Sequence, residues 1–223
     1  MQFIRKREDY GYIIIRDFFL PNFDEPYKKI HFLCKKLCDD IILKHTLSVL
    51  TSKEHHSMRS PRLDQLFVDF YTVERDFNFI SSTKTYNKNH NVSLRENGFL
   101  SFPWRRESLT WMFDKFEDKD FICKYDDIAH SITLVKPFDI YFVNEGNHSI
   151  ACGKLFNKNG IIPCDSAIDY TNIIKEYNFD GKYFINSNGK KINKPYYKEL
   201  SYLFYLGKIL VEINSSHEKT HTL

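Results

Sequence analysis

The sequence lacks the cysteine patterns that mark a disulfide framework or a zinc site. Its five cysteines are an odd number, and no pair has the spacing of a C-x-x-C motif. We therefore expect a reducing compartment. Cys34 and Cys38 are four residues apart and would share one face of a helix, where we expect buried thiols that act as small hydrophobic groups.

The sequence also lacks an uninterrupted apolar run long enough to cross a membrane. Basic and then apolar residues occur near its start. Asp9, Arg16 and Asp17 interrupt this run well short of the apolar core of a signal peptide. These observations predict a soluble cytoplasmic protein with no membrane partner.

A large excess of charge of one sign is absent as well. The 32 Lys and Arg residues nearly balance the 29 Asp and Glu residues, which gives a net charge of +3. Proteins that bind nucleic acid without sequence preference usually concentrate more positive charge on one surface. The lysines over residues 28–36 are followed directly by Asp39 and Asp40 and are typical of a solvated helix face. Composition therefore leaves nucleic acid open as a partner without requiring it.

What the sequence does have is ample material for a buried core. Apolar residues make up 42% of it, and 20 Phe and 14 Tyr supply large side chains. No internal repeat and no linker is visible, so we expect a single domain over residues 1–223. Within it, residues 1–120 are expected to form a mainly helical extension and residues 121–223 an α/β core.

The first half of the sequence is predicted to be mainly helical. A helix is expected over residues 24–50, because its first residue can cap it, Pro26 suits a first turn and apolar residues recur near helical spacing. A second helix is expected over residues 64–75 and a short one over residues 107–116. Residues 83–98 carry little apolar content and are predicted to be an exposed loop. Four histidines of this half are expected to be solvated or satisfied in the core rather than metal ligands: His31, His45, His55 and His56.

The second half changes to short β-branched and aromatic runs separated by polar residues, which is the pattern of strands. Strands are expected over residues 121–125, 131–135, 139–143, 161–168 and 182–185. Helices are expected over residues 148–157, 170–177 and 195–211. The predicted fold class is α/β, more closely α+β, with a helical N-terminal half packed on a small mixed sheet and with a C-terminal helix.

The most informative stretch covers residues 137–153, PFDIYFVNEGNHSIACG. An apolar extended run breaks at residues 145–149 and continues as the first turn of a helix. The unpaired N–H groups of a first helical turn point outward, and the helix dipole favours negative charge beside them. The sequence therefore predicts an anion site at this turn, and the expected ligand is a phosphate.

Each side chain of the turn has a chemistry that suits such a site. Gly146 allows a tight turn and a close approach of ligand to backbone. Asn147 or Ser149 can cap the helix or donate to an oxyanion, and His148 can bond a phosphate oxygen or carry a proton. Glu145 can hold Mg²⁺ or take a proton from an attacking hydroxyl or water. The alternative is purely structural: the turn ends a strand and caps a helix, and His148 bonds a backbone carbonyl.

Two arginines precede the predicted helix over residues 107–116. Arg105 and Arg106 follow Trp104, and a guanidinium can grip a phosphate as a fork or stack on a base. They are therefore candidate phosphate-binding residues. The alternative is a solvated pair beside a buried Trp104.

Residues 128–170 resemble the core of the ParB/sulfiredoxin-like superfamily. In that superfamily a strand runs into an acidic-Gly-x-His-Arg turn, then a helix rich in small residues, then a strand after a Gly. The matching elements are the strand 141–144, the turn 145–148, Ala151 and Gly153 on the helix, and residues 160–163. Relatives in that superfamily include CTP-hydrolysing partition proteins, nucleases, an ATP-dependent sulfinic-acid reductase and free-serine kinases.

The resemblance implies a nucleotide or phosphate site in which Gly146, Asn147 and His148 form the phosphate turn and Glu145 is the acidic position. Ser149 stands where the superfamily commonly has Arg, so the usual phosphate clamp is missing. Arg105 or Arg106 would have to supply that charge. The turn also lacks the Cys that sulfiredoxin chemistry needs.

Two hypotheses from different classes follow. The first is a ParB-like enzyme of phosphoryl or phosphodiester chemistry, a nuclease, NTPase or kinase-like protein, that uses Glu145, His148 and Mg²⁺ on a nucleotide or nucleic acid. The second is a non-catalytic interaction module that works through a protein partner in a bacterial mobile-element or phage-defence system.

Overall fold

The computed structural model describes residues 10–22, 25–52, 60–68, 84–118, 121, 123–125 and 129–220. The elements before the central sheet are the helices α1 (Tyr10–Asn22) and α2 (Pro26–Thr51) and the 3₁₀ turn η1 (Leu63–Gln65). The central elements are β1 (Lys84–Ser93), β2 (Phe99–Leu100), α4 (Arg106–Glu117), β3 (Ser131–Lys136), β4 (Ile140–Glu145), α5 (Asn147–Leu155) and β5 (Ile161–Asp169). The chain then forms α6 (Thr171–Glu176), β6 (Asn178–Phe179), β7 (Phe184–Ile185) and the C-terminal helix α7 (Lys198–Thr220).

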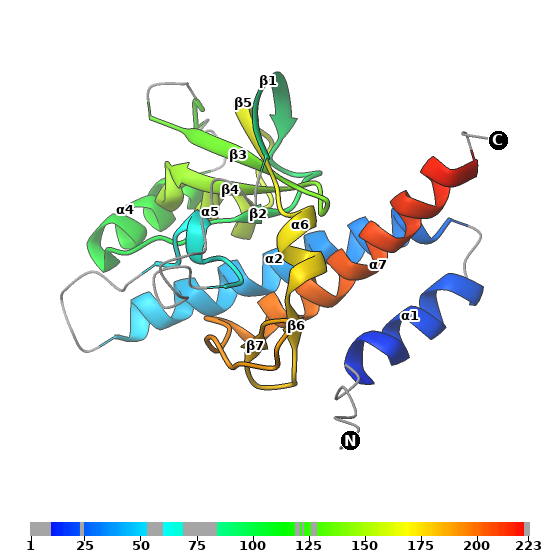
Figure 1. Cartoon of the computed structure of the whole chain (residues 1–223). Coiled ribbons are helices and arrows are strands. Elements are labelled where there is room, and N and C mark those ends of the chain that lie inside the picture. Colours follow the sequence, from blue (N-terminus) through cyan, green and yellow to red (C-terminus); the bar gives the residue numbers. More distant parts are fainter. Residues whose placement is uncertain are drawn as a thin grey trace, which may run out of the picture.

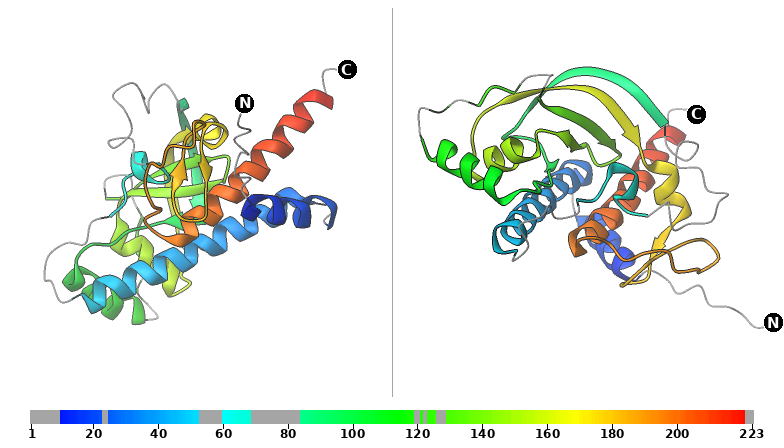
Figure 2. Two further views of the ribbon diagram at one scale, coloured as in Figure 1. Left: turned by 60° about the horizontal axis from the view of Figure 1, so that its bottom comes forward. Right: turned by 90° about the vertical axis from the view of Figure 1, so that its left-hand side faces the viewer.

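A mixed five-stranded sheet with the order β1-β5-β3-β4-β2 forms the centre of the fold. β3 pairs antiparallel with β4 and parallel with β5, while β1 pairs antiparallel with β5 and β2 parallel with β4. The long helices α2 and α7 run side by side, and the curved sheet arches over them (Figures 1 and 2). The predicted fold class, a mixed α/β fold with a C-terminal helix, is confirmed.

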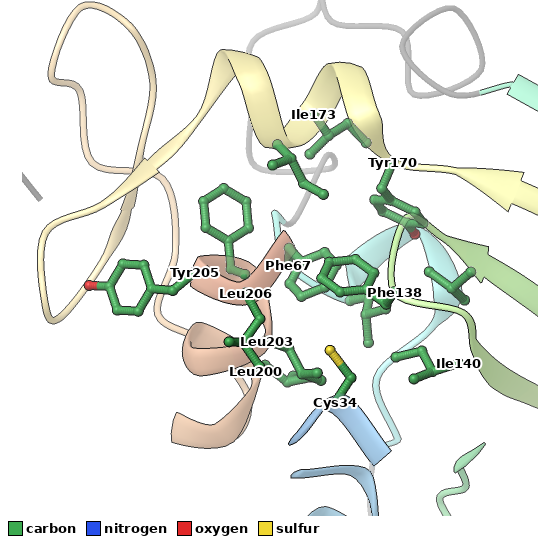
Figure 3. Close-up of a cluster of buried hydrophobic side chains, with 14 of the residues drawn as sticks. Cys34, Phe67, Phe138, Ile140, Tyr170, Ile173, Leu200, Leu203, Tyr205 and Leu206 are labelled. Atoms are coloured by element: carbon green, nitrogen blue, oxygen red, sulfur yellow. The ribbon is translucent and has the colours of Figure 1, made fainter. Parts of the chain in front are cut away.

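Apolar side chains cover both faces of the sheet. Along β4 they alternate: Ile140 and Phe142 join the cluster that contains α2, α6 and α7, while Tyr141 and Val143 join the cluster that contains α5. Figure 3 shows the first cluster, in which aromatic and leucine side chains fill the space between α7 and the sheet. The β4–α5 connection is therefore anchored by a strand that is buried on both sides.

Most of the periodic segments fold as the sequence predicts. The structure contains the predicted helices as α2, α4, α5, α6 and α7, and the predicted strands over residues 131–135, 139–143 and 161–168 as β3, β4 and β5. Cys34 and Cys38 are fully buried on α2, as expected. No helix in the described part of the chain has the length and apolar character that a membrane crossing needs.

The predicted loop over residues 83–98 is wrong, because residues 84–93 form β1 and pair with β5. An edge strand needs backbone pairing on one side only, so a polar sequence can form it without an apolar pattern. As a consequence the sheet takes strands from both sides of residue 120.

Two further predictions need correction or lie partly outside the described residues. Residues 121 and 123–125 are irregular rather than a strand. The predicted helix over residues 64–75 begins as a 3₁₀ turn and bends, and residues 69–75 lie outside the described residues, as do His55 and His56. The helix α1 has no counterpart among the predicted elements.

Candidate functional site

The turn between β4 and α5 is built around a glycine. Gly146 has φ 82° and ψ 22°, the left-handed region that other residues rarely adopt. A Cβ at this position would lie 2.4 Å from Cδ2 of His130, so there is no room for a side chain either. The backbone conformation and the packing both require glycine at this point.

Asn147 uses its side chain to hold the segment that leads into α4. It is 6% exposed. Its Oδ1 accepts a hydrogen bond of 2.6 Å from the backbone N–H of Phe102, and its Nδ2 donates to the carbonyl of Val143 at 3.3 Å. Ser101 Oγ also donates to the Asn147 carbonyl, at 2.8 Å. The amide predicted to contact a ligand is committed to the protein's own backbone.

Ser149 is buried and points back into the turn. Its Oγ donates to the Gly146 carbonyl at 3.0 Å and lies 2.8 Å from Nε2 of His130. His130 is also buried, and no periodic pattern or motif in the sequence points to it. This pair fixes the inner side of the turn and leaves the Ser149 hydroxyl turned away from solvent.

His148 is held by the backbone just before α4. Its Nε2 accepts hydrogen bonds from the N–H groups of Trp104 at 3.3 Å and Arg105 at 3.1 Å. Because Nε2 accepts, the proton of the neutral ring sits on Nδ1. Burial lowers the pKa of the His148 imidazole from 6.5 to about 4, so the ring is neutral at pH 7. The ring also meets Trp104 edge to face, with centroids 4.6 Å apart.

The two arginines point to different parts of the molecule. The Arg106 guanidinium donates to the carbonyl of Ser52 at the end of α2, where the helix dipole favours a positive charge. The Arg105 side chain is exposed and has no hydrogen-bond or ion-pair partner among the described residues. Glu145 is likewise exposed without a partner in that part of the chain. Of the two candidate arginines, only Arg105 is available to a ligand at the turn.

Two surface cavities adjoin this turn, and both have volumes within the usual range for small-molecule sites. The β4 cavity, at the end of β4, has a volume of about 550 Å³, and its lining includes Arg62, Asp64, Phe102, Trp104, Asn144 and Asn147. The α4 cavity has a volume of about 450 Å³ and is lined by Glu107, Ser108, Trp111, Met112 and His148. Trp104 lines the β4 cavity and His148 lines the α4 cavity, and the two rings are in contact. Figure 1 shows α4 and α5 next to each other beside β4.

The first turn of α5 between these cavities has no side-chain cap. The backbone N–H groups of Asn147, His148 and Ser149 have no partner among the described residues. Ile150 N–H, by contrast, closes the first helical bond onto the Gly146 carbonyl at 3.0 Å. These three amides therefore retain the partial positive charge of a helix N-terminus.

The described residues at this turn offer few ligands for a resident metal ion. Within the described ranges no group of three or more His, Cys, Asp or Glu side chains is placed to hold a metal ion. Glu145 is a single carboxylate. A Mg²⁺ ion at this turn would need further oxygen ligands from a phosphate or from water.

The comparison with protein families places the whole of this arrangement within one family. The model of DUF6710, a family of unknown function, matches residues 21–217. The chain belongs to the DUF6710 family. No curated protein and no solved structure matches the chain significantly. The matched span of this DUF6710 member includes the turn and both cavities, whereas nearly all of α1 precedes it.

Proposed function

We propose that this DUF6710 member binds a phosphate-bearing small molecule of the nucleotide class at the first turn of α5. The observation that carries the proposal is a helix N-terminus that lies between two cavities of ligand size and has three amides without a partner among the described residues. A phosphate oxygen would accept from these amides. The rest of the ligand would occupy the adjoining cavities.

Charge and ring chemistry around the turn support the same ligand class. Arg105 is the exposed cation next to His148. Its charge would replace that of the arginine that the ParB/sulfiredoxin-like superfamily commonly has at the position of Ser149. Trp104, 37% exposed, offers a flat aromatic surface. Phosphate recognition by main-chain amides and a guanidinium, with apolar walls for the remainder, is the usual composition of a nucleotide site.

Calorimetry with the three ligands ATP, GTP and CTP in the presence of Mg²⁺ tests this proposal. Arg105→Ala should weaken the tightest of them about tenfold, because it removes a charge-assisted hydrogen bond worth about 1.5 kcal/mol. The control is Arg95→Ala, since Arg95 is also exposed but lies in the turn between β1 and β2. Absence of binding at millimolar concentration, or equal affinity of the two variants, would contradict the proposal.

Catalysis is a second candidate, favoured by the carboxylate of Glu145, which is exposed and has no partner in the described part of the chain. In this version the ligand's phosphates carry Mg²⁺ and Glu145 completes its shell or takes a proton. His148 is a poor base, because its Nε2 already accepts two N–H groups and its pKa is about 4. Glu145→Gln should then abolish turnover of the bound nucleotide or of nucleic acid while leaving binding intact. Glu96→Gln is the matched control.

Binding without turnover would favour the alternative that the protein is a ligand-responsive interaction module, such as a partner in a bacterial mobile-element or phage-defence system. The commitment of Asn147, Ser149 and Arg106 to internal contacts supports this version. For either version we infer a cytoplasmic location, since all five cysteines are free thiols and four of them are buried.

A further inference from the structure

We propose that the α4 cavity is a subsite for a nucleobase and that it selects guanine. This inference rests on the proposed function for the ligand's phosphate, but its base chemistry comes mainly from Glu107 and Trp111, which play no part in binding the phosphate. The subsite combines an exposed tryptophan, a methionine and three polar groups in a cavity of about 450 Å³.

Trp111 provides the stacking surface. The chain has only two tryptophans, and both are exposed: Trp104 by 37% and Trp111 by 55%. An exposed aromatic ring that lines a cavity can stack on a planar ligand. Lys115 lies over the Trp111 ring, with its Nζ 5.8 Å from the centroid, and this contact restrains the indole. A base would stack on a ring that is already held in place.

Helical spacing brings the polar groups to the same cavity. Glu107 and Trp111 are four residues apart on α4, as are Ser108 and Met112, so these pairs share one side of the helix. His148 faces them from α5. Its Nε2 is occupied by the Trp104 and Arg105 amides, so the group it has left is the Nδ1–H donor.

The acceptor in this set decides which base fits. The Glu107 carboxylate is exposed and has no hydrogen-bond or ion-pair partner among the described residues. A carboxylate accepts only, and its two oxygens suit two parallel N–H donors. Guanine presents such a pair, N1–H and N2–H, on one edge. Adenine and cytosine each place a ring acceptor beside their amino group, and that acceptor would face the carboxylate unfavourably.

The charges around the two subsites determine the orientation of the bound nucleotide. The Glu107 carboxylate repels phosphate, while the amides of α5 and the Arg105 guanidinium attract it. His148 lines the α4 cavity and belongs to the first turn of α5, so one residue borders both subsites. A guanine nucleotide would therefore lie with its base against Trp111 and its phosphate toward Asn147 and Arg105.

The two tryptophans allow the subsites to be monitored separately. In Trp104→Phe the only remaining indole is Trp111, and saturable quenching of its fluorescence by GMP is expected, with AMP binding at least about tenfold more weakly. Glu107→Gln should remove that preference. Glu117→Gln, an exposed glutamate at the end of the same helix, should keep it. Circular dichroism of each variant checks that it is folded.

Titration with guanosine separates this inference from the proposed function. Quenching of Trp111 by guanosine that Arg105→Ala leaves unchanged supports the base subsite even if the phosphate site fails. Binding of inorganic triphosphate without any guanosine or GMP effect on Trp111 overturns the base subsite and leaves the phosphate site standing. An equal response to GMP and AMP, or an unchanged preference in Glu107→Gln, also overturns it.

Discussion

His45 and His148 hold the same short segment, residues 103–105, from two sides and in opposite ways. His45 Nε2 donates to the carbonyl of Pro103 at 2.8 Å, and its Nδ1 accepts from the Tyr197 hydroxyl at 2.6 Å. His148 Nε2 instead accepts from the amides of Trp104 and Arg105. The two imidazoles are therefore opposite tautomers of the neutral ring.

The difference between them lies in the second nitrogen. His45 is fully buried with both nitrogens bonded, which is the description of a structural core histidine. His148 is partly exposed and lines a cavity, and its Nδ1 has no partner among the described residues. Burial lowers the pKa of both rings. A lowered pKa is therefore common to a core residue and a candidate site residue, and the two are separated by exposure, by the cavity and by the unused donor.

The largest expected effect comes from removing His45. His45→Ala leaves the Tyr197 hydroxyl and the Pro103 carbonyl without partners and opens a cavity in a packed region. We expect a loss of about 3 kcal/mol in the free energy of unfolding, measured by urea denaturation. Tyr197→Phe, which removes only one of the two bonds, should cost about 1 kcal/mol. If His45→Ala costs less than about 1 kcal/mol, the hydrogen bonds of His45 to Tyr197 and Pro103 contribute little to stability.

A smaller loss of stability is expected from replacing His148. His148→Ala removes the acceptor for two amides that water can reach, so the cost should be about 1 kcal/mol. Its effect on nucleotide affinity should be larger than that of His45→Ala in the same calorimetric assay. If both variants lose affinity only in proportion to their loss of stability, His148 is structural as well.

At neutral pH the smallest change in stability is expected from His148→Gln, whose main consequence is a different pH dependence of stability. Because folding lowers the pKa of His148 from 6.5 to about 4, the unfolded chain binds the proton more readily over that interval. The contribution of the neutral His148 ring to the free energy of unfolding is therefore fully present above pH 6.5 and is lost as the pH falls toward 4. His148→Gln, which keeps an acceptor without a titrating group, should show a shallower fall of the urea midpoint between about pH 6.5 and 5. An unchanged slope would contradict the assigned burial of the ring.

The sequence predicts most of this fold because its signals are local. The helices α2 and α7 have apolar spacing over many turns, and β4 is an apolar run, Ile140 to Val143, followed by Asn144, Glu145 and then Gly146. The strand β1 cannot be predicted from its own residues, because an edge strand depends on its pairing with β5, which lies some seventy residues further along the chain. The position of the site turn follows from the strand, glycine and helix pattern alone.

The orientation of the side chains at the turn could not be predicted in this way. Asn147 and Ser149 turn inward because Phe102 and His130 meet them there, and both partners come from other parts of the sequence. Arg106 differs from its neighbour Arg105 only because the end of α2 lies beside it. Trp111 has the spacing of an ordinary amphipathic helix residue, and only the packing of α4 against α5 shows that it borders a cavity.

A crystal structure with a non-hydrolysable GTP analogue and Mg²⁺ would show whether the amides of the first turn of α5 receive a phosphate. We expect phosphate oxygens within hydrogen-bond distance of the amides of Asn147, His148 and Ser149, with the Arg105 guanidinium turned toward them. An analogue bound elsewhere, or a crystal soaked at millimolar concentration in which this turn carries no ligand density, would contradict the claim.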